Sequence, residues 1–151
     1  MNLILDQGNT ATKIVLADRG QAVYSAAYPR LETDELAALI DRYRPERGII
    51  ASVATPDPAW LDLLRRRLRR FLSLNDDPAI RLPITIGYRT PETLGRDRIA
   101  AAVGAWTLRP EVPLLIIDAG TAITYDLVLP PGHFVGGNIS PGLTTRFRAL
   151  H

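Results

Sequence analysis

The sequence predicts an α/β fold built from two related lobes, and an internal repeat is the main observation behind this prediction. The segment LILDQGNTAT at residues 3–12 returns as LIIDAGTAIT at residues 115–124, so residues 6 and 118 correspond at an offset of 112. Each copy reads as an apolar strand, an aspartate, a glycine turn and a second apolar strand. Between the copies, helical and strand-like segments alternate, which is typical of mixed sheets flanked by helices.

The first copy is expected to form three strands joined by tight turns. These strands are predicted at residues 2–6, 12–18 and 21–27. Asn9 and Gly20 are turn residues. Thr33 is a candidate N-cap for a helix that runs to about Tyr43 and ends before Pro45.

An arginine-rich segment follows a short buried strand expected at residues 48–53. Apolar residues recur through it at helical spacing, namely Trp60, Leu64, Leu68 and Phe71. We therefore predict an amphipathic helix that opens at Pro56 and Pro58 and ends near Leu74, with its arginines in solvent. A nucleic-acid or anionic-lipid patch is the alternative, but no aromatic interleaving or nucleic-acid motif supports it.

The remaining elements divide the chain into two parts. A strand is expected at residues 84–88, and Thr93 or Asp97 could cap a helix to about Leu108. Residues 109–113 resemble a boundary, which predicts a first lobe at 1–112 and a second at 113–151. The second lobe begins with strands at residues 114–118, 122–129 and 134–139, followed by a helix from Pro141. Its remaining helices and strand are missing by internal symmetry, so we expect a C-terminally truncated, incomplete lobe.

Composition narrows the class of protein. The chain has 151 residues, 46% apolar and 23% charged, which is typical of a globular protein with one domain or two small lobes. It has no cysteine, which excludes disulfides and cysteine-based metal sites. The N-terminus lacks a signal-peptide pattern and no apolar run is long enough to span a membrane. We expect a cytoplasmic protein without a membrane or nucleic-acid partner.

The two aspartate–glycine turns are the first candidate sites. Asp6 at a strand end can hold Mg²⁺, and Gly8 lets phosphate oxygens approach the backbone. Turn amides form anion-binding concavities, and Lys13 adds a possible charge. Asp118 with Gly120 repeats the arrangement. Either hairpin alone favours a plain turn with a capping aspartate, whereas the pair in register favours two turns facing a metal-bound polyphosphate across a cleft.

Two further segments carry candidate chemistry. Asp97 lies near a predicted helix start between two arginines, where an ionised carboxylate could act as a general base, and Arg98 could bind a substrate carboxylate. The alternative, an N-capping aspartate with surface arginines, is favoured by spacing alone. The glycines of residues 136–142 either admit a ligand or form a tight strand-to-helix turn, which are equally good interpretations.

Taken together, these motifs resemble type III pantothenate kinases, a family of the actin-like ATPase, acetate-kinase and sugar-kinase superfamily with a ribonuclease H-like duplicated fold. Four stretches carry the resemblance: DQGNT at 6–10 with Lys13; PETLGRDR at 91–98 with Tyr88 before it; DAGTA at 118–122 with Thr124 and Asp126; and GGNISPG at 136–142. Their order and separations match along the whole chain. Gln7 stands where the family often has a small apolar residue.

The resemblance implies a function and a set of site residues. The family transfers phosphate from ATP to pantothenate, the first step of coenzyme A biosynthesis. It implies that ATP is bound by Asp6, Gln7, Gly8, Asn9, Thr10, Ala11, Thr12, Lys13 and Thr121. It implies that pantothenate is bound by Tyr88, Gly95, Arg96, Asp97 and Arg98, within a substrate segment at 88–98. Asp97 is then the proton acceptor.

The same resemblance implies cofactors and a quaternary state. Asp6 is implied to handle Mg²⁺, and Asp118 to bind the monovalent cation, K⁺ or NH₄⁺. Family members are longer than this chain and form homodimers in which the partner closes part of the pantothenate pocket. The activity of this 151-residue chain alone is therefore an open question.

Other functions remain as alternatives. Another small-molecule kinase of the superfamily, such as a sugar kinase, is less consistent with Arg98, because a guanidinium suits a carboxylated substrate better. A non-catalytic regulatory homologue on the same fold is less consistent with the retained Asp6, Asp97 and Asp118. A stable fragment without function is the third alternative.

Overall fold

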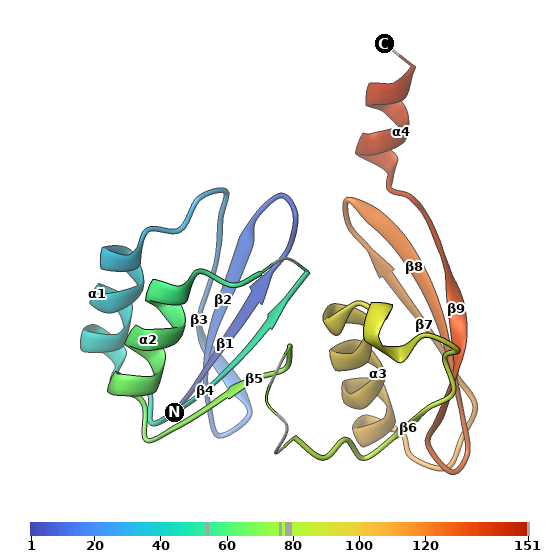
Figure 1. The fold of residues 1–151 in the computed structure, drawn as a ribbon, viewed down its shortest axis with the longest axis horizontal. Helices are drawn as coiled ribbons and strands as arrows, with labels where there is room; N and C mark the ends of the chain where they lie inside the picture. Colours follow the sequence, from blue (N-terminus) through green and yellow to red (C-terminus); the bar gives the residue numbers. More distant parts are fainter. Residues whose placement is uncertain (54, 76, 78–79, 151) are drawn as a thin grey trace. The chain divides into compact units, whose positions relative to one another are not determined.

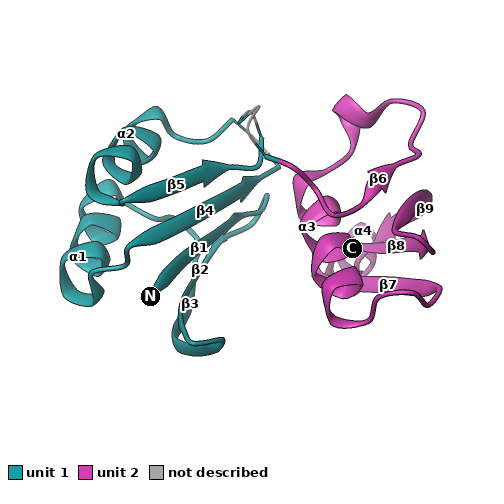
Figure 2. Ribbon diagram, turned by 90° about the horizontal axis from the view of Figure 1, so that it is seen from below, with its two compact units in different colours: residues 1–80 teal, residues 81–151 magenta. Residues whose placement is uncertain are grey.

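The computed structural model describes residues 1–53, 55–75, 77 and 80–150. The chain divides into two compact units, residues 1–80 and 81–151, which Figure 2 distinguishes by colour. The predicted first lobe extends to residue 112, whereas the structure groups residues 81–112 with the second unit. None of the described helices is long and apolar enough to cross a membrane.

Unit 1 contains a five-stranded mixed sheet. Its strands are β1 (Asn2–Gln7), β2 (Thr12–Asp18), β3 (Gln21–Tyr28), β4 (Arg47–Ser52) and β5 (Arg70–Ser73). The order across the sheet is β3-β2-β1-β4-β5, in which β1, β2 and β3 are antiparallel neighbours and β4 and β5 extend the sheet in parallel. The first three predicted strands are confirmed within one residue.

Two helices, α1 (Thr33–Tyr43) and α2 (Pro58–Arg67), lie side by side against the sheet of unit 1 (Figure 1). They bury Leu36 and Leu64 against the alternate, inward-facing residues Leu3, Ile14 and Leu16. The N-cap of α1 is Glu32, which exchanges hydrogen bonds with the third helical residue in a capping box, so the expectation of a Thr33 cap is wrong. A glutamate can take this place because it supplies the same acceptor.

The arginine-rich segment is shorter as a helix than predicted. α2 ends at Arg67, and residues 70–73 form β5, which pairs in parallel with β4. The predicted helix to Leu74 is therefore wrong from Leu68 onward. Leu68 and Phe71 still pack against the core of unit 1, but Phe71 does so from a strand. Apolar spacing of three and four residues could not distinguish these two geometries.

Unit 2 contains a four-stranded mixed sheet in the order β6-β9-β8-β7. Its elements are β6 (Thr85–Ile86), a 3-10 turn (Pro91–Thr93), α3 (Arg96–Leu108), β7 (Leu114–Ala119), β8 (Ala122–Leu129), β9 (His133–Pro141) and α4 (Leu143–Ala149). α3 packs on this sheet through Ile99, Ala102 and Trp106, which share a core with Val128 and Phe134. The expected strands of the second copy are confirmed, as is the helix that follows them.

The repeat is visible in the burial of the second strand of each copy. Along β2, Thr12, Ile14 and Leu16 face inward, and at the offset of 112 the inward positions of β8 include Asp126 and Val128. The two turns differ by one residue, because Asp6 pairs with Lys13 whereas Asp118 pairs with Thr124. The expected duplicated mixed sheets flanked by helices are thus present, with a tighter turn in the second copy.

The packing of α2 gives a test of the unit 1 core. Leu64 is fully buried, so Leu64→Ala removes its apolar contacts and leaves a cavity. We expect the free energy of unfolding in urea, followed by circular dichroism, to fall by about 2–5 kcal/mol. Leu108→Ala, at a position that is 80% exposed, is the control and is expected to stay within about 0.5 kcal/mol of the wild type. Equal losses in the two variants would contradict the described packing.

Candidate functional site

The β1–β2 turn holds the first group of candidate residues. The Gly8 N–H donates to the carbonyl of Ala11 at 3.0 Å, which closes the turn directly after the Gln7–Thr12 pair. A Cβ on Gly8 would lie 3.3 Å from the same carbonyl oxygen, so glycine fits the close backbone approach. A pocket of ≈ 260 Å³ adjoins this turn and is lined by residues 7–12, with residues 29–31, Asp57 and Trp60 opposite. Such turns bind anions through backbone N–H groups.

Asp6 and Lys13 are cross-strand neighbours just before this turn. The Lys13 Nζ lies 3.4 Å from the Asp6 Oδ2, and the side chains are 65% and 39% exposed. An exposed pair at this distance contributes little to stability, about 0–1 kcal/mol. Either group can therefore leave this pair and bind a ligand at a small cost in free energy.

The oxygen chemistry of Asp6 fits a magnesium ion that is shared with a substrate. Mg²⁺ in proteins is usually held by one or two carboxylates, waters and substrate phosphates rather than by a closed protein cage. Within the described ranges, no cluster of three His, Cys, Asp or Glu side chains could hold a metal alone. Asp6 thus fits a role as one ligand of a metal–polyphosphate complex.

Gln7 has a structural role in unit 1. Its Oε1 accepts a hydrogen bond from the Ser52 hydroxyl at 2.9 Å, and its carbonyl accepts one from the Val53 N–H at 3.0 Å. These bonds join the end of β1 to the end of β4. The side chain of Gln7 is therefore held by the sheet, and only its backbone remains a candidate for ligand contact.

In unit 2, the β7–β8 turn holds the second aspartate. The Gly120 N–H donates to the Ala122 carbonyl at 2.9 Å, and the Thr121 carbonyl accepts from the Gly142 N–H at 2.9 Å. A Cβ on Gly142 would lie 2.0 Å from the Gly120 oxygen, so only glycine fits against the turn. Asp118 is exposed and makes no hydrogen bond or ion pair within the described part of the chain. Its oxygens suit a hard cation.

Asp97 lies in the first turn of α3. The N-cap of this helix is Gly95, so the expected caps Thr93 and Asp97 are both wrong. The Asp97 Oδ1 accepts the Arg98 N–H at 2.9 Å, and a Cβ on Gly95 would lie 2.4 Å from that oxygen. Gly95 thus clears the space that the carboxylate occupies. The positive end of the helix dipole favours a negative charge at this position.

Arg98 forms the buried ion pair of unit 2. Its Nε donates to both carboxylate oxygens of Asp126, at 3.0 and 3.2 Å, and its Nη2 donates to Oδ1. The side chains of Arg98 and Asp126 are 6% and 1% exposed. The hydrogen bonds to Asp126 raise the pKa of the Arg98 guanidinium above its ordinary value, against the opposing effect of burial.

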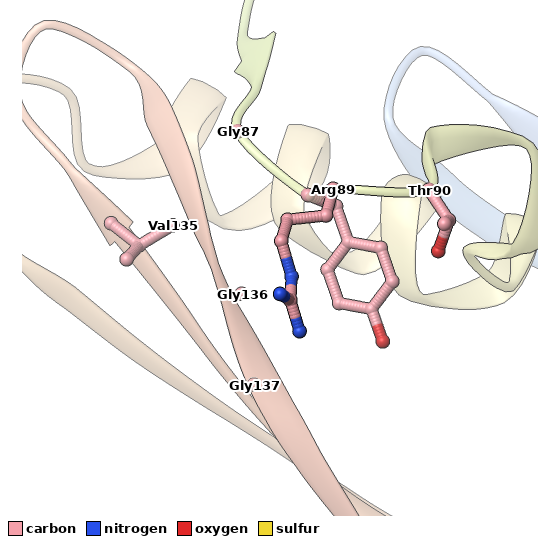
Figure 3. A pocket seen from close by; sticks show the side chains of 7 residues that line it. Gly87, Arg89, Thr90, Val135, Gly136 and Gly137 are labelled. Atoms are coloured by element: carbon pink, nitrogen blue, oxygen red, sulfur yellow. The ribbon is translucent and has the colours of Figure 1, made fainter.

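A pocket of ≈ 390 Å³ lies beside this ion pair within unit 2 (Figure 3). Residues 87–90 line one side, and Val135, Gly136 and Gly137 of β9 line the other. The Arg98 guanidinium lies 5.9 Å from the centre of the Tyr88 ring. Tyr88 and Arg98, both in the predicted substrate segment, thus lie close together, but the guanidinium of Arg98 is hydrogen-bonded to Asp126.

Asp126 is a site residue to which the sequence analysis assigned no role. The internal repeat contained a signal for it, because Asp126 occupies the position that corresponds to Ile14, a fully buried core residue of unit 1. A carboxylate in place of a core isoleucine requires a buried partner. That partner, Arg98, could not be identified from spacing because it lies 28 residues away on a helix.

The family model and the curated relatives that match this chain carry the same family description. The family model described as type III pantothenate kinase matches residues 2–151. Curated relatives with that name include proteins from Phocaeicola vulgatus, 42% identical over 151 residues, and Azobacteroides pseudotrichonymphae, 40% identical over 151 residues. Each match covers 100% of this chain, but only 62% and 61% of the relatives. The chain thus spans about three fifths of the length of these curated relatives.

Two solved structures are also similar. A putative N-acetylglucosamine kinase from Porphyromonas gingivalis has a TM-score of 0.43 and 15% identity, covering 95% of this chain and 48% of its own. A Bacteroides thetaiotaomicron protein of unknown function, described as having an actin-like ATPase fold, has a TM-score of 0.41 and 12% identity, covering 54% of this chain and 34% of its own.

The Arg98–Asp126 pair can be tested by stability. Asp126→Asn leaves a buried guanidinium without its counter-charge, so we expect the free energy of unfolding to fall by about 3–5 kcal/mol in urea. The matched control is Asp62→Asn, which breaks an exposed pair with Arg66 and is expected to cost less than about 1 kcal/mol. A loss at Asp126 no larger than at Asp62 would show that the pair is not buried as described.

Proposed function

This chain belongs to the type III pantothenate kinase family, and on that premise we propose that it phosphorylates pantothenate with ATP to give 4'-phosphopantothenate, the first step of coenzyme A biosynthesis. The observation that carries the proposal is the family match over residues 2–151, which includes every candidate site residue. The whole enzyme's activity is part of the proposal, because the chain spans 62% of the first relative.

In the proposed reaction, the β1–β2 turn binds the phosphates of ATP. The adjoining pocket supports this role, because Gly8, Thr10 and Thr12 of the turn line it. The weak, exposed pair of Asp6 and Lys13 supports an exchange in which Lys13 faces phosphate and Asp6 faces Mg²⁺. Mg²⁺ neutralises phosphate charge when it is bound with ATP.

Asp97 is proposed as the proton acceptor for the attacking hydroxyl of pantothenate. Its Oδ1 is oriented by the Arg98 N–H, and its Oδ2 has no partner among the described residues. One fixed oxygen and one available oxygen suit a positioned general base. Tyr88 and the Gly95 turn would hold the substrate beside it. Asp118 is proposed to bind a monovalent cation, and Thr121 to contact ATP.

The proposed base can be tested by Asp97→Asn, which keeps the size of the side chain and removes its basicity. We expect kcat for ADP release to fall by about 10²–10⁴-fold, with pantothenate binding retained. The assay uses this chain and a chimera in which the C-terminal part of the Phocaeicola vulgatus relative follows residue 151. Phosphopantothenate is identified by mass spectrometry.

The matched control for the proposed base is Asp34→Asn, since Asp34 occupies the same position in the first turn of α1 that Asp97 occupies in α3. The control is expected to turn over at the wild-type rate. If Asp97→Asn is as fast as the wild type, Asp97 is not the base. ADP release that does not depend on pantothenate would refute the assigned substrate.

The proposed cation site gives a second kinetic test. Asp118→Asn removes the charge of an exposed carboxylate, so we expect the K⁺ concentration for half-maximal activity to rise by about tenfold or more, because cation affinity follows ligand charge. The control is Glu111→Gln, which removes an exposed acid shortly before β7. An unchanged K⁺ response in Asp118→Asn would exclude the site.

A further inference from the structure

We propose that Arg89, and not Arg98, is the residue that binds the carboxylate of the substrate in the pocket of unit 2. The identity of that substrate, pantothenate, rests on the proposed function. The assignment of Arg89 rests on the different environments of the two arginines. Arg89 lies within the predicted substrate segment at 88–98, but it is not among the individual residues that the resemblance implies to bind pantothenate.

Arg98 already forms a buried ion pair with Asp126 within unit 2. Its Nε and Nη2 both donate to Asp126, so one of the two edges through which a guanidinium binds a carboxylate is already occupied, and the whole side chain is only 6% exposed. A Cβ on Gly137 would lie 2.8 Å from Nη2, which means that the β9 backbone is packed directly against this nitrogen. A second carboxylate at Arg98 would place two negative charges against one positive charge in a buried site, which is strongly unfavourable.

Arg89 is in the opposite situation. It is exposed, it lines the pocket, and it forms no ion pair or hydrogen bond within the residues that the structure describes. Figure 3 shows its side chain extending from the irregular segment that follows β6 toward Gly136 and Gly137 of β9. Its five N–H donors are therefore available to a ligand in the pocket.

The rest of the pocket sets the chemical class of that ligand. Apart from Arg89, the lining residues are uncharged, so the pocket carries one positive charge and no acid. The ring of Tyr88 and the side chain of Val135 offer apolar contact, and the glycines expose backbone. Such a pocket suits a small monoanion with an uncharged body. A carboxylate can accept two parallel hydrogen bonds from a guanidinium, which fixes its orientation as well as its position.

The test compares pantothenate with its alcohol analogue, in which a CH₂OH group replaces the carboxylate. Binding of both compounds to this chain is measured by isothermal titration calorimetry for the wild type, Arg89→Ala and Arg89→Lys. We expect Arg89→Ala to weaken pantothenate by about 10-fold to 100-fold, the range for a hydrogen bond to a charged group. Binding of the alcohol analogue should be unchanged, and Arg89→Lys should recover part of the loss.

The control variant is Arg109→Ala, which removes an exposed arginine of unit 2 at the end of α3 and changes the net charge equally. It should bind pantothenate as the wild type does. If Arg89→Ala retains the full preference for pantothenate over the alcohol, the assignment of Arg89 is wrong while the proposed function stands. If the wild type binds neither compound, the proposed function fails for this chain, and the assignment of Arg89 fails with it.

Discussion

The ion pair between Arg98 and Asp126 is the constraint on which the candidate site of unit 2 depends. It joins the first turn of α3 to the middle of β8, and the β9 backbone at Gly137 packs against it. The neighbouring residue Asp97 lies in the same helical turn, so the direction of its carboxylate follows from where the pair holds α3. The guanidinium also lies 5.9 Å from the centre of the Tyr88 ring. One buried contact therefore positions the candidate base and the wall of the pocket together.

Burying an ion pair of this kind carries a free-energy penalty of desolvation, which offsets much of the attraction between the charges. Its main effect is to fix the position of the backbone segments that it joins. The repeat makes this visible, since unit 1 has Ile14 at the corresponding position and packs it in an apolar core. The same strand position is therefore occupied by an apolar core residue in unit 1 and by one member of a buried ion pair in unit 2. The replacement succeeds only because α3 delivers a guanidinium to that point. The two copies therefore share their strands and turns but differ in the side chain that packs against this position of the second strand.

The sequence predicted the features that depend on local pattern. The three strands of each copy, α1, and the turns at Gly8 and Gly120 follow from alternation and turn chemistry, and the structure agrees with them. β5 was missed because Leu68 and Phe71 fit helical spacing, and only pairing with β4 reveals a strand. The ion pair of Arg98 with Asp126 was not predicted for the same reason, since Asp126 is distant in sequence. Long-range pairing is what a single sequence does not display.

Burial separates charges that hold the structure from charges that can meet a ligand. Asp6 and Lys13 form an exposed pair at 3.4 Å, and an exposed pair is weak enough to open when a charged ligand arrives. Arg98 and Asp126 are nearly inaccessible, and opening them would leave an uncompensated charge inside unit 2. Burial therefore indicates that a charged residue of a motif can stabilise the structure while a nearby residue outside the motif contacts the ligand. Arg89 and Arg98, nine positions apart on one segment, divide these two tasks between them.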